Sequence, residues 1–294
     1  MTTDGTDWRA LTAVAALASH RLVGWIYWDP AAVANYAALG IPDGAGYYLA
    51  TRAASIAAAG DDVVTAVFGS IHPDFVSFCL DLCRRHTTFE AAAEARDAAV
   101  EPGLHRIAPD LCDGLAELGP DLWAAAGELV LTGRPLCASL LGRRREDQPL
   151  LSAWLAVNCI REWRGDTHWA IHAAEGIDGT MAGLLDGAWR GHDDDWLPRS
   201  RGADDDALAA ALARLEARGL ASDGRVDEAG IAYRQELEDR LDDLCAPGWQ
   251  ALGEAGTRRL VQLVEPHGTA FVEHIDRTAG PRWMPAARDR TVRA

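Results

Sequence analysis

The sequence predicts a mostly α-helical fold with one short β-hairpin. Alanine and leucine dominate the 294 residues, and successive segments carry apolar residues at the i, i+3, i+4 and i+7 spacing of an amphipathic helix. Turns rich in glycine and proline separate these segments, and one Asp-Gly pair has the signature of a two-residue hairpin turn. Hydrophobic residues make up 49% of the chain and charged residues 24%, which is typical of a folded globular protein with about two domains.

Short helices are expected in the N-terminal part. Trp8 to Tyr27 form the first, and Asp29-Pro30 supplies an N-cap and a first-turn proline for a second, which ends at the break from Gly40 to Gly44. Leu150 to Trp163 is helical, and Gly165 is expected to interrupt that helix. Such short helices with tight turns are typical of a helix-turn-helix cluster. The other periodic segments of this part predict helices over 47–56, 61–70, 73–82, 88–100, 105–118 and 120–132.

The apolar period stops between Gly187 and Ala203, in a stretch rich in aspartate, glycine and arginine. Because such a stretch is typical of a linker, we predict a domain boundary near residue 195. The expected units are an N-terminal helical domain over residues 1–190, a C-terminal domain over 196–277, and a flexible tail over 278–294.

The C-terminal domain is predicted to contain a helix, a hairpin and a second helix in that order. The first helix covers Asp204 to Gly219, the hairpin turns at Asp223-Gly224, and a long helix extends to about Leu244. Two further helices are expected near 249–264 and 266–276. This order is typical of a winged helix, in which the hairpin is the wing.

Two passages around the hairpin carry a family resemblance. Leu215-Glu216-Ala217-Arg218-Gly219-Leu220, followed by Asp223-Gly224-Arg225-Val226-Asp227-Glu228-Ala229-Gly230, resembles the L-x-x-R-G-L and D-G-R-x-T-x-x-G passage of MarR-type winged-helix proteins, with Asp227 in place of the usual threonine. The whole chain is similar to an actinobacterial family of MarR-related helix-turn-helix proteins, often named SalK-like, on residues 46–54, 68–73, 133–136 and 161–168. The family pattern R-E-H-R-G-D-x-H has a histidine where this chain has Trp163. The resemblance implies two winged-helix-like units and a possible homodimer.

Charge argues against nucleic acid as a partner. The net charge is −16, and residues 203–250 carry 12 acidic side chains against five arginines, so this surface is expected to repel duplex DNA. No apolar run reaches the roughly 20 residues that span a bilayer, and no basic segment of a signal peptide opens the chain, so we expect a cytoplasmic protein with no membrane partner. The six cysteines lie in apolar helical patterns, where reduced core thiols are expected.

The segment from Arg161 to His172 is the strongest candidate site. If it is helical across Gly165, the side chains of Arg161, Arg164, His168, His172 and Glu175 share one face, and those of Glu162 and Asp166 share the adjacent one. Arg164 could hold an anionic group, while His168 beside Asp166 or Glu162 could act as an acid or base. The alternative is an internal salt-bridge network with no ligand.

Other candidates would form the opposite wall of a pocket. Tyrosines at a domain seam, arginines that extend to water and tryptophans in a core give each of them a structural alternative. The candidate ligand-binding residues outside the acid–base group are Arg164, Arg52, Tyr47, Tyr48, His72, Arg134, Trp163 and Trp169.

No metal site is expected. His168, His172 and Glu175 have ligand spacing, but Trp169 stands where a zinc peptidase helix needs a glutamate. Cys79, Cys83 and His86 have similar spacing in an apolar helix, where cysteine behaves as a small hydrophobic residue.

The sequence as a whole predicts a protein that binds a small molecule and has weak or lost DNA binding. One alternative is an enzyme of specialised metabolism that uses His168 with Asp166 or Glu162, and another is a MarR-type transcriptional regulator. No cofactor is identified, and whether the protein is an enzyme stays open.

Overall fold

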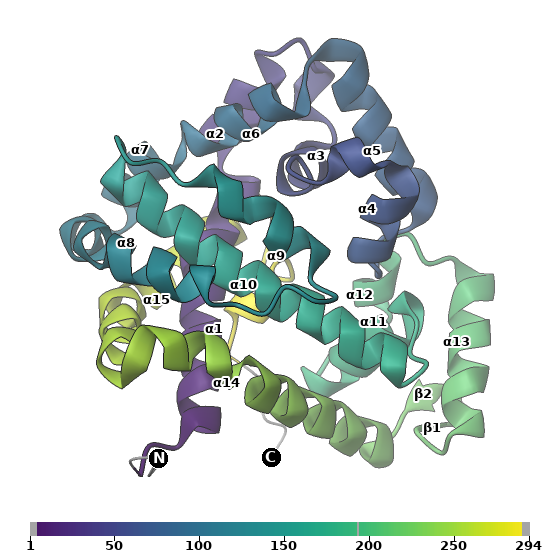
Figure 1. Ribbon diagram of the computed structural model, residues 1–294. Helices are drawn as coiled ribbons and strands as arrows, with labels where there is room; N and C mark the ends of the chain where they lie inside the picture. Colours follow the sequence, from purple (N-terminus) through teal and green to yellow (C-terminus); the bar gives the residue numbers. More distant parts are fainter. Residues whose placement is uncertain (1–4, 193, 290–294) are drawn as a thin grey trace.

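The computed structural model describes residues 5–192 and 194–289, which are mostly helical (Figure 1). Within this described part, the helices are α1 (Trp8–Gly24), α2 (Pro30–Ala37), α3 (Tyr47–Arg52), α4 (Asp61–Val67), α5 (Pro73–His86), α6 (Phe89–Asp97), α7 (Val100–Ile107), α8 (Cys112–Gly127), α9 (Pro135–Leu140), α10 (Pro149–Ala174), α11 (Gly179–Trp189), α12 (Trp196–Arg199), α13 (Asp205–Ala217), α14 (Glu228–Val264) and α15 (Gly268–Thr278). The strands β1 (Ala221–Ser222) and β2 (Arg225–Val226) form an antiparallel pair.

Helix α10 lies at the centre of the molecule, where α1, α8, α9 and α14 pack against it (Figure 1). Every residue from Leu150 to Arg164 is buried, which matches a sequence that is apolar nearly all round the helix. The main core joins residues of α1, α8, α10 and α14 with Met284 and Ala287 near the end of the described chain. Two smaller cores lie under α3 to α5 and between α11, α13 and the hairpin.

Helix α10 is continuous through Gly165, so the predicted interruption is wrong. A glycine inside a helix costs about 1 kcal/mol relative to alanine, and burial of the flanking turns offsets that cost. Two other helix boundaries predicted from the sequence are also wrong. Pro120 lies inside α8 rather than at the start of a helix, and α14 extends past Pro247 to Val264, with its one non-helical residue at Gly253 (φ 78°). In each case packing against neighbouring helices overrides the local breaker signal.

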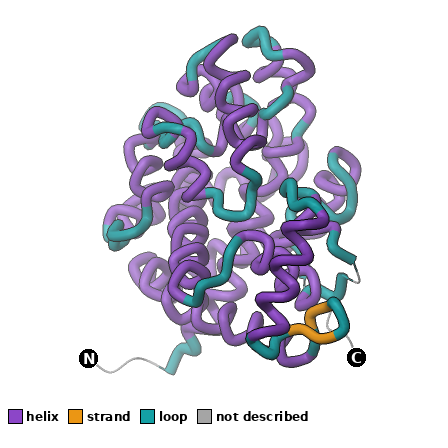
Figure 2. The backbone as a smooth tube through the Cα atoms, turned by 90° about the vertical axis from the view of Figure 1, so that its right-hand side faces the viewer, coloured by secondary structure: helices purple, strands orange, loops and turns teal. Residues whose placement is uncertain are grey.

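The predicted hairpin is confirmed. Ala221 pairs with Val226 and Ser222 with Arg225, and Asp223 (φ 52°) and Gly224 (φ 73°) have the positive angles of a type I′ turn. Figure 2 shows this hairpin as the strand structure among the described residues, between α13 and α14. The predicted order of helix, hairpin and helix is therefore present.

The segment expected to be a linker is packed into the fold. Leu197 and Pro198 of α12 are buried, and α12 packs against α11. The segment after Thr278, expected to be a flexible tail, also packs: Met284 and Ala287 are buried, and Arg21 of α1 donates a hydrogen bond to the Ala287 carbonyl (3.0 Å). Residues 290–294 of that tail lie outside the described residues.

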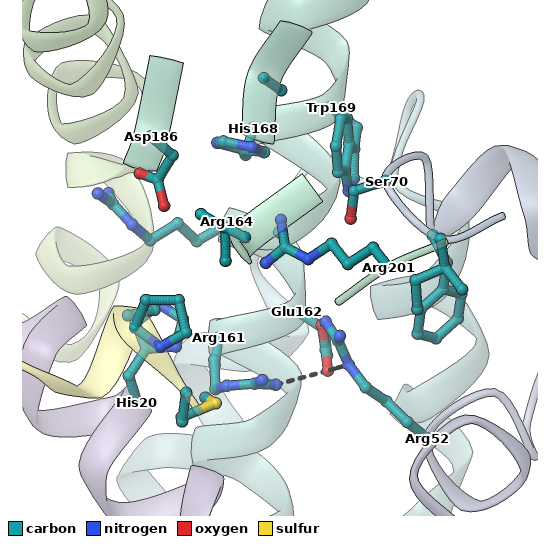
Figure 3. Close-up of a pocket in the computed structure, with 18 of the residues that line it drawn as sticks. His20, Arg52, Ser70, Arg161, Glu162, Arg164, His168, Trp169, Asp186 and Arg201 are labelled. Carbon is teal, nitrogen blue, oxygen red and sulfur yellow. Dashed lines mark hydrogen bonds and ion pairs between the residues drawn. The ribbon is translucent and has the colours of Figure 1, made fainter. Parts of the chain in front are cut away.

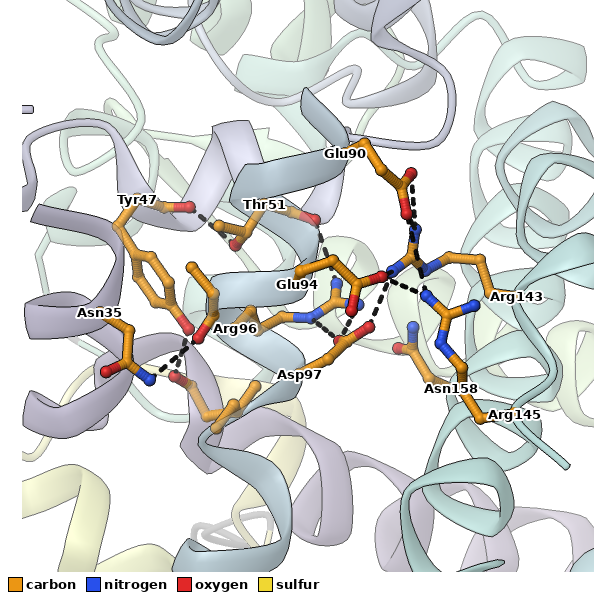
Figure 4. Close-up of polar contacts among 12 residues, drawn as sticks. Asn35, Tyr47, Thr51, Glu90, Glu94, Arg96, Asp97, Arg143, Arg145 and Asn158 are labelled. Carbon is orange, nitrogen blue, oxygen red and sulfur yellow. Dashed lines mark hydrogen bonds and ion pairs between the residues drawn. The ribbon is translucent and has the colours of Figure 1, made fainter. Parts of the chain in front are cut away.

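A buried arginine network fixes α3 in place (Figure 4). Arg96 is 1% exposed and donates to Asp97 (2.6 Å) and to the Thr51 carbonyl of α3 (3.0 Å). Arg143 donates to the other carboxylate oxygen of Asp97 (2.8 Å). Because Thr51 precedes Arg52, this network holds the residue that enters the site described below.

All six cysteines are buried free thiols, as the sequence predicts. Among the described residues, no helix is both long and apolar enough to cross a membrane.

Candidate functional site

A cavity of about 410 Å³ lies beside the C-terminal half of α10 (Figure 3). Its walls come from α3, the turn between α4 and α5, α10, α11, α12 and its following turn, α14, and the C-terminal segment. A volume of this size is within the range of small-molecule sites. The cavity therefore joins elements from all parts of the described chain around one helix.

One face of α10 lines the cavity. Arg161, Arg164 and His168 face it together, because side chains three and four positions apart lie above one another on a helix. His172, predicted on the same face, packs behind His168 with ring centroids 4.0 Å apart, and it does not line the cavity. Glu175 lies further along and accepts hydrogen bonds from Arg240 and Tyr233.

The first ion cluster joins α3 to α10. Arg52 holds the Glu162 carboxylate with two hydrogen bonds of 2.7 and 2.6 Å, and Arg161 donates to the same carboxylate at 2.5 Å. Burial alone would raise the pKa of Glu162, but the two guanidinium groups lower it to about 2. The Tyr48 hydroxyl accepts a further bond from Arg52 (2.5 Å). Glu162 is thus an ionised structural partner shared by two arginines.

The second ion cluster joins α10, α11 and α14. Asp186 contacts Arg190 (2.9 Å) and Arg234 (3.1 Å), and Glu238 contacts Arg234 (2.7 Å) and Arg164 (2.6 Å). The second ion cluster ends at Asp242, whose Oδ1 lies 2.7 Å from Nη1 of Arg164, at ion-pair distance but without hydrogen-bond geometry. Burial raises the pKa of Asp242 to about 6 in spite of Arg164.

Asp166 anchors the neighbouring helix α9. Its two carboxylate oxygens accept hydrogen bonds from the backbone N–H groups of Cys137 (2.9 Å) and Leu136 (3.4 Å), at the start of that helix. Burial raises the pKa of Asp166 to about 6, and these two bonds oppose the shift only in part. Asp166 is therefore held by α9, on a different side of α10 from the His168 ring.

His168 is uncharged at neutral pH. Burial lowers its pKa well below the usual value, and His172 and Arg234 lower it further. Among the described residues its side chain makes ring contacts with Trp169 and His172 but no hydrogen bond to a carboxylate. The structure does not bring Asp166 or Glu162 to His168 as an acid–base pair would require.

Seven aromatic side chains form the apolar wall of the cavity. Trp283 bridges Trp28 (ring centroids 5.8 Å) and Trp196 (5.4 Å), and Trp28 stacks on Tyr48 (5.7 Å). The full set is Trp28, Tyr48, Phe68, Phe75, Trp169, Trp196 and Trp283.

Half of the eight predicted ligand-binding side chains line this cavity: Arg164, Arg52, Tyr48 and Trp169. The other four are engaged elsewhere. Tyr47 is buried and donates to the Ile26 carbonyl (3.0 Å), and His72 is half exposed and caps α5. Arg134 donates to Thr167 (2.9 Å) and lies over the Trp163 ring, whose N–H donates to the Val130 carbonyl (2.8 Å).

Several cavity residues were missed from the sequence. The main ones are His20, Asp186, Arg190, Arg201, Arg234, Glu238, Trp196 and Trp283. Trp196 and Arg201 lie in the predicted linker from Gly187 to Ala203, where two tryptophans and three arginines among few apolar residues were the available signal. Asp186 and Arg190 have the i, i+4 spacing of a helical ion pair, which sequence could have indicated.

In the described part of the chain, no group of three or more histidine, cysteine, aspartate or glutamate side chains converges as metal ligands. His168 and His172 are adjacent, but Glu175 points to Arg240 instead of to them.

Comparison with known proteins gives the class of the chain. The sequence pattern of a helix-turn-helix family matches residues 12–277, and the chain belongs to this family. No curated protein and no solved structure matches the chain significantly.

Proposed function

We propose that this helix-turn-helix protein binds a small organic molecule in the cavity beside α10. The observation that supports this most is the composition of the cavity wall, which combines seven aromatic rings with side chains of two ion clusters and with two uncharged histidines, His20 and His168. Apolar walls with a few fixed polar groups are the usual form of a small-molecule site. The ion clusters keep the arginine and carboxylate side chains in place before a ligand arrives.

The alternative of a purely structural network accounts for the ion clusters but not for the open space between them. A packed salt-bridge network would fill its own volume, because protein interiors have few voids larger than water. Here about 410 Å³ stays open next to His168, whose ring nitrogens are not used by a carboxylate.

The test is ligand stabilisation of the purified protein against a library of small molecules. A ligand that binds only the folded state raises the melting temperature by an amount that grows with its concentration. We expect compounds with an apolar body to raise it, His168→Ala to reduce that shift, and His105→Ala on the exposed side of α7 to leave it unchanged. A library in which no compound binds, or binding that is equal in the His168→Ala variant, would contradict the proposal.

A second candidate is a DNA-binding regulator, which membership of a helix-turn-helix family favours. Several features of α13 weigh against it. This helix begins beside three aspartates, Asp204 to Asp206, and its exposed Arg214 and Arg218 are held by hydrogen bonds to the carbonyl groups of Gly176 and Glu175 (3.0 and 2.8 Å).

A gel-shift experiment at low salt with mixed-sequence duplex separates the two candidates. We expect no complex at micromolar protein. A complex that weakens with rising salt would support the regulator, because release of counterions from phosphates gives that dependence.

A further inference from the structure

Arg201 is the feature of the cavity that the ion clusters do not explain. It follows α12, and its backbone is fixed on both sides, since its N–H donates to the Pro198 carbonyl (3.1 Å) and its carbonyl accepts from the His72 N–H (2.8 Å). The side chain extends into the cavity between Trp169 and Glu162 (Figure 3). No described residue forms a hydrogen bond or ion pair with its guanidinium group.

The other five arginines of the cavity are already paired. Arg52 and Arg161 share Glu162, while Arg164, Arg190 and Arg234 share Asp186, Glu238 and Asp242. Each of these guanidinium groups contacts at least one carboxylate within 3.1 Å. A ligand would have to break such a pair to use one of them.

The charges around the cavity leave one positive charge unbalanced. Six arginines face the carboxylates of Glu162, Asp166, Asp186, Glu238 and Asp242, and with pKa values of about 6 the side chains of Asp166 and Asp242 are mainly ionised at pH 7.5. His20 and His168 add no charge, because burial lowers the pKa of each ring well below its usual value. Among these six arginines, Arg201 is the one with no described carboxylate at ion-pair distance, and its guanidinium stays cationic at neutral pH.

An unpaired cation in a half-buried, aromatic site is costly, and an anion that enters relieves the cost. A single negative charge balances the cavity, whereas a dianion would leave it with an excess of negative charge. The guanidinium fork also suits the two oxygens of a carboxylate or sulfonate group.

We infer that the ligand is an organic monoanion, with a carboxylate or sulfonate group paired to Arg201 and an apolar body against the Trp169 side of the cavity. This inference rests on the proposed function. It adds the charge of the ligand and the residue that binds its anionic group. The aromatic wall described above supplies the contact for the body.

The test compares three probes of one shape: 2-naphthoate, its neutral amide 2-naphthamide, and the dianion naphthalene-2,6-dicarboxylate. Isothermal titration at pH 7.5 is expected to show 2-naphthoate binding at least tenfold more tightly than either of the others. In Arg201→Gln the advantage of the acid over the amide disappears, while the affinity for the amide stays within threefold. Arg199→Gln is the matched control: it removes the same charge from the exposed end of α12, where Arg199 pairs with Asp195 and Asp205, and the preference for the acid stays.

The outcomes separate this inference from the proposed function. If acid and amide bind wild-type protein equally, or the dianion binds best, the charge class is wrong although the cavity binds ligands. If Arg201→Gln keeps the full preference, Arg201 is not the anion-binding residue. If none of the three probes binds at millimolar concentration, both proposals fail for ligands of this shape. An unchanged melting temperature of Arg201→Gln shows that a loss of binding is not a loss of fold.

Discussion

At the scale of single residues, the most consequential assignment is that of Asp166. This acid lies at the centre of the charged segment of α10, where it was predicted to work with His168. Its carboxylate instead accepts two backbone hydrogen bonds at the start of α9, and burial raises its pKa to about 6. The acid therefore determines where α9 begins, and it is a titratable group buried in the folded state.

Asp166 is expected to make stability depend on pH. Its folded pKa of about 6 lies above the usual 3.8, so its contribution to the free energy of unfolding is complete below about pH 4 and is lost as the pH rises through 6. We expect the stability of Asp166→Asn relative to wild type to increase by on the order of 2 kcal/mol between pH 4.5 and 7.5. Urea unfolding at the two pH values measures this difference.

Asp121→Asn on the exposed side of α8 is the control for that experiment, since its carboxylate is solvated in both the folded and the unfolded state. Its stability relative to wild type should be the same at both pH values, within about 0.5 kcal/mol. A pH-independent difference for Asp166→Asn as well would show that the Asp166 carboxylate titrates normally in the folded protein.

At the scale of elements, α11 begins unusually close to the turn after α4. A Cβ atom on Gly179 would lie 2.1 Å from the Gly69 carbonyl oxygen and 2.7 Å from Cα of Ser70. These are backbone atoms and cannot rotate away. Glycine at this position therefore allows the turn that carries Ser70 to approach the cavity.

Gly179→Ala is expected to lower the free energy of unfolding by about 2–3 kcal/mol, because one of two backbone segments must move. Gly142→Ala is the control, since a Cβ there meets no atom within 4 Å and the change should stay within about 0.5 kcal/mol. Thermal or urea unfolding measures the stabilities of the two variants. Equal stabilities would mean that α11 and the turn after α4 are not packed against each other.

Residue patterns local in the sequence predict most of the helices, the hairpin and part of the cavity lining. Helix periodicity placed Arg161, Arg164 and His168 on one face, because that geometry depends only on neighbours along the chain. Asp223-Gly224 likewise determines its own turn. Arg201 and Trp196 could not be found in this way, because their segment has no periodicity and its position depends on contacts with α11 and with the backbone of His72. The same limit explains the continuous helix at Gly165.

At the scale of the whole molecule, the cavity is closed by residues far from α10 in sequence. Trp283 is 36% exposed, contacts Trp28 and Trp196, and follows Arg282, which pairs with Asp194 (2.7 Å). The C-terminal segment is thus a wall of the cavity that contributes no charged side chain to the two ion clusters, although the Pro285 carbonyl accepts a hydrogen bond from Arg190 (2.8 Å).

Trp283→Ala is expected to weaken binding of 2-naphthoate and 2-naphthamide alike, each by roughly tenfold, because it removes apolar contact without changing charge. Trp8→Ala, which removes the half-buried indole ring of a tryptophan outside the cavity, should leave both affinities unchanged. Isothermal titration of Trp283→Ala with both probes gives the two affinities, which are compared with those of Arg201→Gln. A loss confined to the acid would mean that Trp283 acts on Arg201 rather than on the body of the ligand.

The packing of α1 against α14 has a consequence for how the protein reaches this structure. These helices contact each other more extensively than most pairs in the molecule, yet about 200 residues separate them along the chain. Contacts between distant segments slow folding, because the entropy of closing a long loop is lost before the contact forms. During synthesis, the apolar face of α1 has no native partner on α14 until that helix has been made. Folding of the main core is therefore expected to be a late and slow event for a helical protein of this size.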